Sequence, residues 1–491
     1  MSYLGRQLNV PASVFEAVAD GSITAGSTVV IKSSGKVANV TDQSASTSSP
    51  GEINGNRQTD FDTAYDASQN CVLVVYRENS VAGKACVRAA TLSGSTLTFG
   101  TEVVTDMIPA GARVSIASDG SGGFILVCED SNQSNKQFAL AGTVSGTSIT
   151  IGNDAEFADS TYGINDIMFD STSGKFVIVY VDNQNSFYLT AKVATRSGTG
   201  FSLGSAVAIS SETYLYGLRC TEDTDENRVV VFAGGSSQVR CVAGQVSGTS
   251  TSWGSVVQLT SSKVVHDGEE NTCEITYDSS AKATVFVYCD DETSPSKKTV
   301  ALIATLSGST ATIGSRQILY GDDKARQPSA VYDPVSQKVL VAFDKGADGQ
   351  PRTGQFLLAT ITGGTSRSAT VSGLTEFESG RTSMPSLVHH SGENKNVIFY
   401  SDEDDTDTGK YVIQASQFQN FTDFIGFTDT TYDDGDLVKV QVGGSVNGLQ
   451  SGLTAGQTYF VQTDGSIGTS AASTSVTAGT AVSATEILVK G

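Results

Sequence analysis

Two acidic runs are the residues whose type and spacing could bind a metal ion. The longer run, SDEDDTD at 401–407, includes Asp404 and Asp405, and its alternating carboxylates resemble the start of a calcium-binding loop. No Glu occupies the twelfth position and the glycine is misplaced, so we predict a solvated loop tip without metal. Asp290 and Asp291 begin a shorter run, DDE, which has the same interpretation. Both pairs remain candidate contacts for a polar ligand.

An aromatic pair stands in a loop that is otherwise polar. Phe187 and Tyr188 follow Asn183 in the segment VDNQNSFYL, whose neighbouring side chains are Asn, Asp, Gln and Ser. Aromatic rings in such a loop could stack on a sugar ring, and Asn183 is grouped with them as a candidate ligand contact. The alternative is that the two rings begin the next strand.

No catalytic or metal-binding motif is present. The GxSxG, HExxH and P-loop patterns are missing. Seven cysteines occur without a CxxC pair and only three histidines are present, so we expect no zinc site and no cofactor. Most cysteines lie in apolar runs such as CVLVVY and are predicted to be buried, reduced thiols. We therefore expect a protein that is not an enzyme, although two carboxylates placed by the fold could still make a glycosidase.

The elements that must position these residues contain a repeated phrase. TLSGSTLTFGT at 91–101 returns as TVSGTSITIGN, QVSGTSTSWGS and TLSGSTATIGS. The turn glycines of this phrase lie 50 to 60 residues apart, at Gly94, Gly146, Gly198, Gly248 and Gly308, with a degenerate copy at Gly363. An apolar run such as VLVVY or FILVC precedes each turn, and a seventh run, VIFY at 397–400, lacks the turn. Recurrence at this interval indicates a structural unit rather than a catalytic motif.

Each unit is predicted to form four antiparallel strands. A short mixed strand such as FDTAYD precedes the apolar run, which suits a central strand buried on both faces. A variable loop leads to a third strand, and the SG turn then closes a hairpin onto an outer strand. Seven units over residues 58–427 give about 53 residues each. The predicted fold class is all-β, a seven-bladed β-propeller; a β-solenoid and a string of sandwich domains are the alternatives.

Loops of a propeller fall on two faces. The SG turns and the turns after the first strand share one face and are short and uniform. The loops after the central strand lie on the opposite face, vary in sequence, and hold 14 acidic and 9 basic residues, a net charge of −5. A rigid platform that carries variable loops is typical of a recognition surface, and this charge disfavours polyanionic ligands.

Sialidase chemistry is the specific enzymatic alternative on a propeller. It requires three arginines around a carboxylate, together with a Tyr–acid pair and an acid/base Asp. Arg77, Arg240 and Arg352 lie on the variable face, but no spacing marks them as a set. The segment ASDGSGGF at 117–124 is a poor echo of the repeated boxes of such enzymes.

The two chain ends do not follow the repeat. Residues 1–57 are predicted to form a β-hairpin, an attachment segment and a linker, and residues 428–491 a small C-terminal β-domain. PASVFEAVA, near the start, is the one stretch with helical periodicity. The net charge of −21 disfavours nucleic acid and anionic membranes as partners. No secretory signal and no membrane span are visible, so we expect synthesis in a cytoplasm without export or membrane insertion.

Several of these segments resemble proteins of marine bacteriophages. VSGTSITIG and the YD…GKFVIVYVD pattern are similar to tail-fibre-like repeat proteins of cyanophage-like viruses. The opening MSYLG resembles the start of short tail-fibre proteins, whose N-terminal segment attaches to the virion. GLTAGQTYFVQTDGSIGTS near the C-terminus resembles a β-module at the ends of phage virion proteins. These are strand and turn patterns without a catalytic signature, and they imply a component of a virion.

The resemblance and the loop faces lead to three functional hypotheses. The first is a tail fibre or other virion appendage that recognises a host-surface glycan or protein. The second is a purely architectural virion protein, such as a capsid decoration, and the third is a glycan-degrading enzyme of the virion. We expect contacts with other virion proteins through the N-terminal segment, and multiple copies or a homo-oligomer in each particle.

Overall fold

The chain forms two compact units, Thr47–Ala415 and a second unit that combines Met1–Ser46 with Ser416–Gly491. The computed structural model describes the residues 14–32, 35–160, 163–213, 216–234, 238–259, 273–290, 298–322, 324–346, 352–416, 418–472 and 474–490. Strands dominate both units, and the described segments contain five 3-10 turns but no α-helix. No helix in these ranges is long and apolar enough to cross a membrane.

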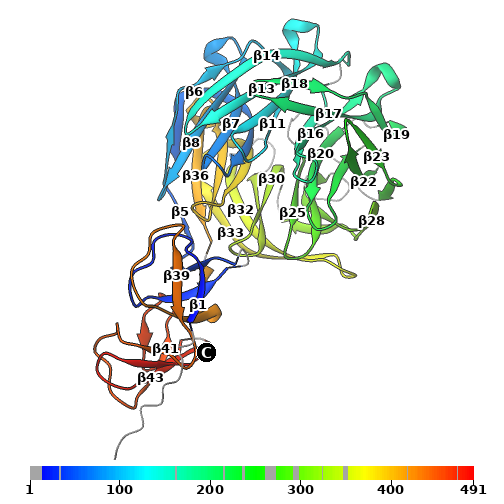
Figure 1. Cartoon of the computed structure of the whole chain (residues 1–491). Coiled ribbons are helices and arrows are strands. Elements are labelled where there is room, and N and C mark those ends of the chain that lie inside the picture. Colours follow the sequence, from blue (N-terminus) through cyan, green and yellow to red (C-terminus); the bar gives the residue numbers. More distant parts are fainter. Residues whose placement is uncertain are drawn as a thin grey trace, which may run out of the picture. The chain divides into compact units, whose positions relative to one another are not determined.

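The unit Thr47–Ala415 is a series of antiparallel meanders that follow one another along the chain (Figure 1). We call them blades 1 to 7. Blade 1 contains the second half of β6 (Gly51–Asp66), β7 (Cys71–Glu78), β8 (Lys84–Ser93), β9 (Thr96–Phe99) and β10 (Val103–Val104). Blade 2 contains β11 (Pro109–Ser118), β12 (Gly123–Asp130), β13 (Lys136–Ser145) and β14 (Ser148–Ala158). Blade 3 contains β15 (Asn165–Asp170), β16 (Lys175–Asp182), β17 (Tyr188–Ser197), β18 (Gly200–Leu203) and β19 (Val207–Thr213).

Blades 4 to 7 repeat this order. Blade 4 contains β20 (Tyr216–Asp223), β21 (Arg228–Gly234), β22 (Val239–Ser247), β23 (Ser250–Trp253) and β24 (Val257–Leu259). Blade 5 contains β25 (Cys273–Asp278), β26 (Ala283–Asp290), β27 (Lys298–Ser307), β28 (Thr310–Ile313) and β29 (Gln317–Tyr320). Blade 6 contains β30 (Ala325–Asp333), β31 (Lys338–Lys345), β32 (Thr353–Thr362) and β33 (Ser368–Glu378). Blade 7 contains β34 (Thr382–His390), β35 (Lys395–Asp402), β36 (Thr408–Ala415) and the first half of β6.

The first strand of each blade is its inner strand, and these strands contact one another in a closed cycle. In order the cycle runs β6, β11, β15, β20, β25, β30, β34 and back to β6. The predicted all-β propeller class is confirmed. The count of seven stays the prediction drawn from the spacing, because strand pairing joins the first and last blades into one nine-stranded sheet.

The apolar runs form central strands whose two faces pack against different neighbours. Every residue of β12 and of β26 is buried. Along β7, Leu73 and Val75 pack into a cluster with Phe124 of blade 2, whereas Val74 packs into a cluster with Phe399 of blade 7. Such strands have no solvent side, which is why they are apolar without alternation. All seven cysteines are buried and free, as predicted.

The recurring phrase is the outer hairpin of a blade, and its two glycines have different functions. Gly94, like its equivalents, has a positive φ in the turn, which a residue with Cβ adopts at a cost. The second glycine, such as Gly204 in FSLG, packs against the hairpin turn of the next blade. A Cβ at Gly204 would lie 1.8 Å from the carbonyl oxygen of Thr249. In the degenerate copy the left-handed residue is Gly364, and Gly363 packs against the Ala281 carbonyl oxygen.

Closure of the ring uses residues that the sequence analysis placed in the linker. The first half of β6 pairs with β36, with Gly51 opposite Tyr411 and Arg57 opposite Thr408. Ile53 is buried in the cluster shared by blades 1 and 7. The propeller unit therefore begins before the predicted boundary at residue 58, because the Gly- and Asn-rich residues 51–57 complete the last blade. β5 (Ser46–Thr47) lies where the two units divide.

The second unit interleaves both ends of the chain, whereas the sequence analysis treated them as separate parts. β1 (Val14–Val18) pairs with β39 (Leu437–Gln441), and β2 (Thr28–Ile31) pairs with β38 (Phe424–Thr428). The helical periodicity of PASVFEAVA does not correspond to a helix in its described part, because β1 is a strand whose alternate side chains enter a small core. The remaining elements are β3 (Val37–Asn39), β4 (Asp42–Gln43), β37 (Phe418–Gln419), η5 (Phe421–Asp423), β40 (Val446–Asn447), β41 (Thr458–Val461), β42 (Ile467–Gly468), β43 (Thr477–Ala481) and β44 (Ile487–Val489).

Candidate functional site

Four loops that follow the central strands share one backbone design. Each begins with a buried or half-buried acid whose carboxylate accepts a hydrogen bond from the backbone N–H two residues later, as Asp182 does from Gln184 at 3.1 Å. A 3-10 turn and two left-handed residues follow. The turns are η1 (Asn79–Val81), η2 (Ser131–Gln133), η3 (Asn183–Asn185) and η4 (Glu403–Asp405). The acidic cap leaves the loop tip free to vary in sequence.

Phe187 is the unusual residue among these loops. The second left-handed position is Gly83 in blade 1, Asn135 in blade 2, Asp407 in blade 7 and Phe187, with φ +60°, in blade 3. Gly, Asn and Asp tolerate this conformation, whereas a bulky side chain is strained there. The Phe187 side chain is nevertheless 36% exposed. An aromatic ring held in this backbone conformation and partly exposed at a loop tip is a candidate for recognition.

The other residues of this loop have structural positions. Asn183 is the first residue of η3. Tyr188 is half-buried and begins β17, opposite Asp182, which agrees with the alternative that the sequence analysis left open for it. Only Phe187 of the predicted aromatic pair therefore belongs to the loop tip.

The carboxylates of the long acidic run, 402–405, contact other residues of the protein. The Asp402 carboxylate caps η4 and forms an ion pair with Lys410 at 2.6 Å. Asp404 accepts a hydrogen bond from the Arg381 backbone N–H at 2.8 Å, and Asp405 lies 3.5 Å from the Lys410 ammonium. Among the residues that the structure describes, no group of three or more His, Cys, Asp or Glu side chains could hold a metal ion. These contacts tie the loop after β35 to β36 and to the residue that precedes β34.

Asp290 is also a structural residue. It ends β26, is fully buried and forms an ion pair with Arg316. Asp291 lies outside the described residues. Asn183, Asp290 and Asp404 thus belong to blades 3, 5 and 7, and no two of these blades are adjacent in the cycle of inner strands.

Two of the three arginines named for a sialidase site have local partners. Arg240 Nε donates a hydrogen bond to Gln258 Oε1 at 3.2 Å, and Arg352 pairs with Asp344 at 3.1 Å. The Tyr76 hydroxyl donates a hydrogen bond to Glu102 at 2.6 Å. Burial raises the pKa of Tyr76, and the nearby Glu102 raises it further, so this phenol stays protonated.

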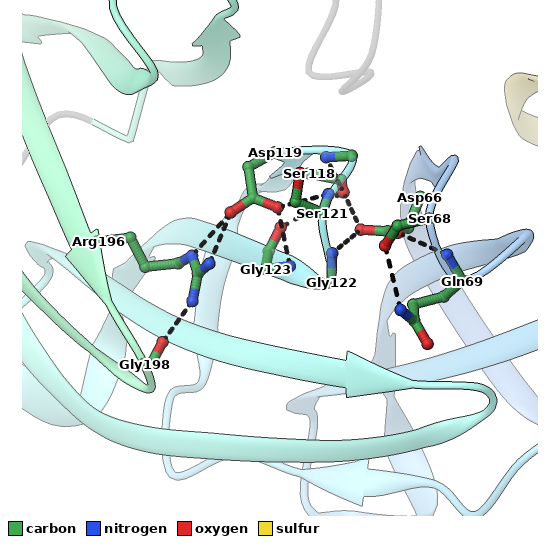
Figure 2. A network of polar contacts seen from close by, with 11 residues as sticks. Asp66, Ser68, Gln69, Ser118, Asp119, Ser121, Gly122, Gly123, Arg196 and Gly198 are labelled. Atoms are coloured by element: carbon green, nitrogen blue, oxygen red, sulfur yellow. Dashed lines mark hydrogen bonds and ion pairs between the residues drawn. The ribbon is translucent and has the colours of Figure 1, made fainter.

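Polar side chains of the uniform turn face bind one blade to the next (Figure 2). The Asp66 carboxylate accepts hydrogen bonds from its own turn, at Gln69 N–H, and from blade 2, at Ser118 Oγ and Gly122 N–H. Burial alone would raise the pKa of Asp66, but a hydrogen bond from the Ser68 hydroxyl, together with those just named, outweighs burial and lowers the pKa. These contacts hold the turns of blades 1 and 2 together.

Arg196 of blade 3 extends this network. Its guanidinium lies 2.6 Å from the Asp119 carboxylate and donates to the carbonyl oxygen of Gly198 at 2.6 Å (Figure 2). Asp119 also accepts from the backbone N–H groups of Ser121 and Gly123, so ASDGSGGF is a tight turn of the scaffold.

Four charged side chains gather on the inner strands, and the sequence analysis did not single them out. Arg219 Nε lies 3.1 Å from Glu274 Oε1, and Arg219 Nη1 lies 3.9 Å from Asp166 Oδ1. Asp62 accepts a hydrogen bond from the Ile116 N–H of the next blade at 2.8 Å. Burial and the Glu274 carboxylate raise the pKa of Asp62 to about 7, although Arg219 opposes the shift. Burial, followed by repulsion from Asp62, also raises the pKa of Asp166.

The cluster predicts an unusual dependence of stability on pH. Because the pKa of Asp62 is raised to about 7 from 3.8, the folded state binds a proton between these values that the unfolded state does not. Stability from this group therefore rises as pH falls from 8 to 5. We expect Asp62→Asn, which keeps the acceptor for Ile116, to stabilise the protein by about 1–2 kcal/mol at pH 8 and little at pH 5. Urea unfolding of both proteins at the two pH values measures this; equal effects at both would contradict it.

A groove between the outer strands of blades 5 and 6 was also missed from sequence. It lies between β29 and β33 and encloses about 500 Å³. The described part of the propeller unit exposes five large apolar side chains, and three of them, Ile318, Val371 and Leu374, line this groove. Convergence of exposed apolar side chains on one hollow marks a candidate ligand site.

No protein-family model and no curated protein matches the sequence. Similar solved structures include the BP39L lectin from Burkholderia pseudomallei, with 10% identity over 74% of this chain and 97% of that chain, at a TM-score of 0.55. Others are the periplasmic gluconolactonase PpgL of Pseudomonas aeruginosa (11% identity, 75% and 98% covered, TM-score 0.46) and the β-propeller domain of the Trilobed protease from Pyrococcus furiosus (11%, 75% and 97%, 0.41). At such low identities only the fold is informative, and only the first match has a TM-score that supports an argument. The chain shares with that lectin the fold of a β-propeller.

Proposed function

We propose that this chain is a surface appendage of a bacteriophage particle, and that its propeller recognises a saccharide of the host surface without catalysing a reaction. The observation that carries the proposal is Phe187. Three sister loops with the same backbone have Gly, Asn or Asp at its position, and only this loop holds an exposed aromatic ring there. Aromatic rings provide the apolar surface on which the C–H face of a sugar packs.

The two faces of the propeller support a recognition role. The turn face uses its carboxylates and Arg196 to hold blades together. The opposite face holds the loops that vary in sequence, and their net negative charge favours a neutral ligand over a polyanion. The lectin that shares the fold is, by its name, a carbohydrate-binding protein, which supports the same class of ligand for this chain.

The assignment to a virion rests on the sequence resemblance and remains part of the proposal. We propose that the unit containing both chain ends attaches the protein to other virion proteins, in several copies per particle. Because β1 and β2 pair with β39 and β38, an attachment surface there would consist of both ends of the chain rather than of the N-terminal segment alone.

Replacing Phe187 with glycine tests recognition separately from folding. Glycine adopts the left-handed conformation without strain, so we expect Phe187→Gly to leave the free energy of unfolding unchanged or to raise it by about 1 kcal/mol. Adsorption of the purified protein to host cells should fall about tenfold or more, since a desolvated aromatic contact is worth over 1 kcal/mol. Adsorption isotherms and thermal unfolding on the same samples measure both quantities.

The sister loop of blade 2 provides the matched control. Asn135→Gly alters the equivalent backbone position and should change neither adsorption nor stability by more than a few tenths of a kcal/mol. If wild-type protein does not adsorb and does not compete with infection, the architectural role replaces our proposal. Release of reducing ends from host glycans would instead favour the enzyme.

A further inference from the structure

We propose that the groove between β29 and β33 binds an N-acetylated sugar of the host surface. This inference rests on the proposed function and adds a second site, remote in sequence from Phe187. Ile318 is 52%, Val371 42% and Leu374 45% exposed. Solvent-exposed aliphatic side chains are common singly, but three around one hollow are not.

A bulge in β33 creates the groove. Phe356 of β32 pairs with Thr375 and Leu358 pairs with Ser372, so Gly373 and Leu374 together stand opposite the single residue Leu357. Gly373 has φ +64°, which permits the bulge and turns Leu374 outward. Below the rim, Leu357 and Leu319 are almost completely buried and form an apolar floor. A volume of about 500 Å³ is within the usual range for sites that hold small ligands.

Charged groups at the rim supply polar partners beside this apolar wall. Lys298 and Asp322 both line the groove, and neither makes an ion pair with any other described residue. The Lys298 side chain runs along Gly321, next to Asp322: a Cβ at Gly321 would lie 3.4 Å from Lys298 Cδ. An ammonium and a carboxylate thus stand at one end of an aliphatic surface.

An acetamido group matches all three features. Its methyl group fits an aliphatic wall, its carbonyl oxygen accepts a hydrogen bond from an ammonium, and its N–H donates to a carboxylate. A sugar with a hydroxyl group at the same carbon could still accept from Lys298 and donate to Asp322, but it would lack the methyl contact. One apolar group gained or lost in a hydrophobic pocket changes discrimination by about 10- to 200-fold. We therefore infer an N-acetylhexosamine rather than a plain hexose as the ligand.

Saturation-transfer NMR on the full chain tests this inference with N-acetylglucosamine against glucose and N-acetylgalactosamine against galactose. We expect an N-acetylated sugar to bind about tenfold or more tightly than its hexose. Leu374→Ser and Lys298→Met should each weaken this binding by about tenfold. Val104→Ser removes a comparably exposed apolar side chain from blade 1, outside the groove, and should have no effect.

The outcomes separate this inference from the proposed function. Equal binding of each sugar and its hexose, no binding of either, or unchanged binding by Leu374→Ser would overturn the groove assignment. If the protein then still adsorbs to cells and loses adsorption in Phe187→Gly, the proposed function stands. If Leu374→Ser loses binding of the sugar but wild-type protein never adsorbs to cells, the groove assignment stands and the host-recognition role fails.

Discussion

Gly204→Ala is expected to destabilise the propeller by about 3 kcal/mol or more, a large effect for the addition of one methyl group. The added Cβ would lie 1.8 Å from the Thr249 carbonyl oxygen of the next blade. Because that oxygen belongs to a backbone turn rather than to a flexible side chain, the two blades must separate to admit it. The same contact recurs at Gly152, where the Cβ would lie 1.9 Å from the Thr199 carbonyl oxygen.

Gly200 in the same hairpin is the control for this substitution. Its φ is not positive, and a Cβ there would meet nothing closer than the Ser197 carbonyl oxygen at 3.6 Å. Gly200→Ala should therefore be neutral or stabilise the protein by up to about 1 kcal/mol, since it removes freedom from the unfolded chain. Chemical unfolding of the three proteins measures the difference, and equal stabilities would mean that adjacent hairpins do not pack as described.

Removing the strand that closes the ring is expected to have the largest effect of all. A chain of residues 47–415 retains the whole of β6, and we expect it to fold cooperatively. A chain of residues 58–415 lacks the pairing of β6 with β36, the ion pair of Arg57 with Asp407 and the buried Ile53. Loss of this apolar burial and of the strand hydrogen bonds should cost on the order of 5 kcal/mol.

Circular dichroism and urea unfolding distinguish the two chains. The shorter chain should be largely unfolded or aggregated, because β36 becomes an open edge and the apolar cluster of blades 1 and 7 is exposed. A folded chain of residues 58–415 with unchanged stability would contradict ring closure by residues 51–57.

Sequence alone predicted the repeated part of the fold because each blade buries an apolar central strand between its two neighbours. Apolar runs such as VLVVY have no polar face, and they are the buried central strands. The SG glycines predicted the hairpin turns because a positive φ selects glycine. The closing strand GEINGNR (51–57) was missed because Ile53 is its only buried residue, so its composition resembles that of a linker.

The candidate sites were less visible from sequence. The four charged residues of the inner-strand cluster occupy equivalent positions, four residues before the end of their strands: Asp62, Asp166, Arg219 and Glu274. An alignment of the repeats would therefore place them in one column. Their mutual approach depends on closure of the ring, which no local pattern encodes. The groove depends on the insertion of one residue at Gly373, and Phe187 is informative only when its left-handed backbone is compared with that of its sister loops.

Hydrogen–deuterium exchange of the full chain, with and without saccharide extracted from the host envelope, tests the claim of recognition most directly. The account predicts slower exchange in residues 183–189 on addition of the saccharide, with slower exchange in residues 371–374 where N-acetylated sugars are present, and no change in the turns at 66–70 and 118–123. Unchanged exchange throughout the propeller, or protection confined to those turns, would contradict it.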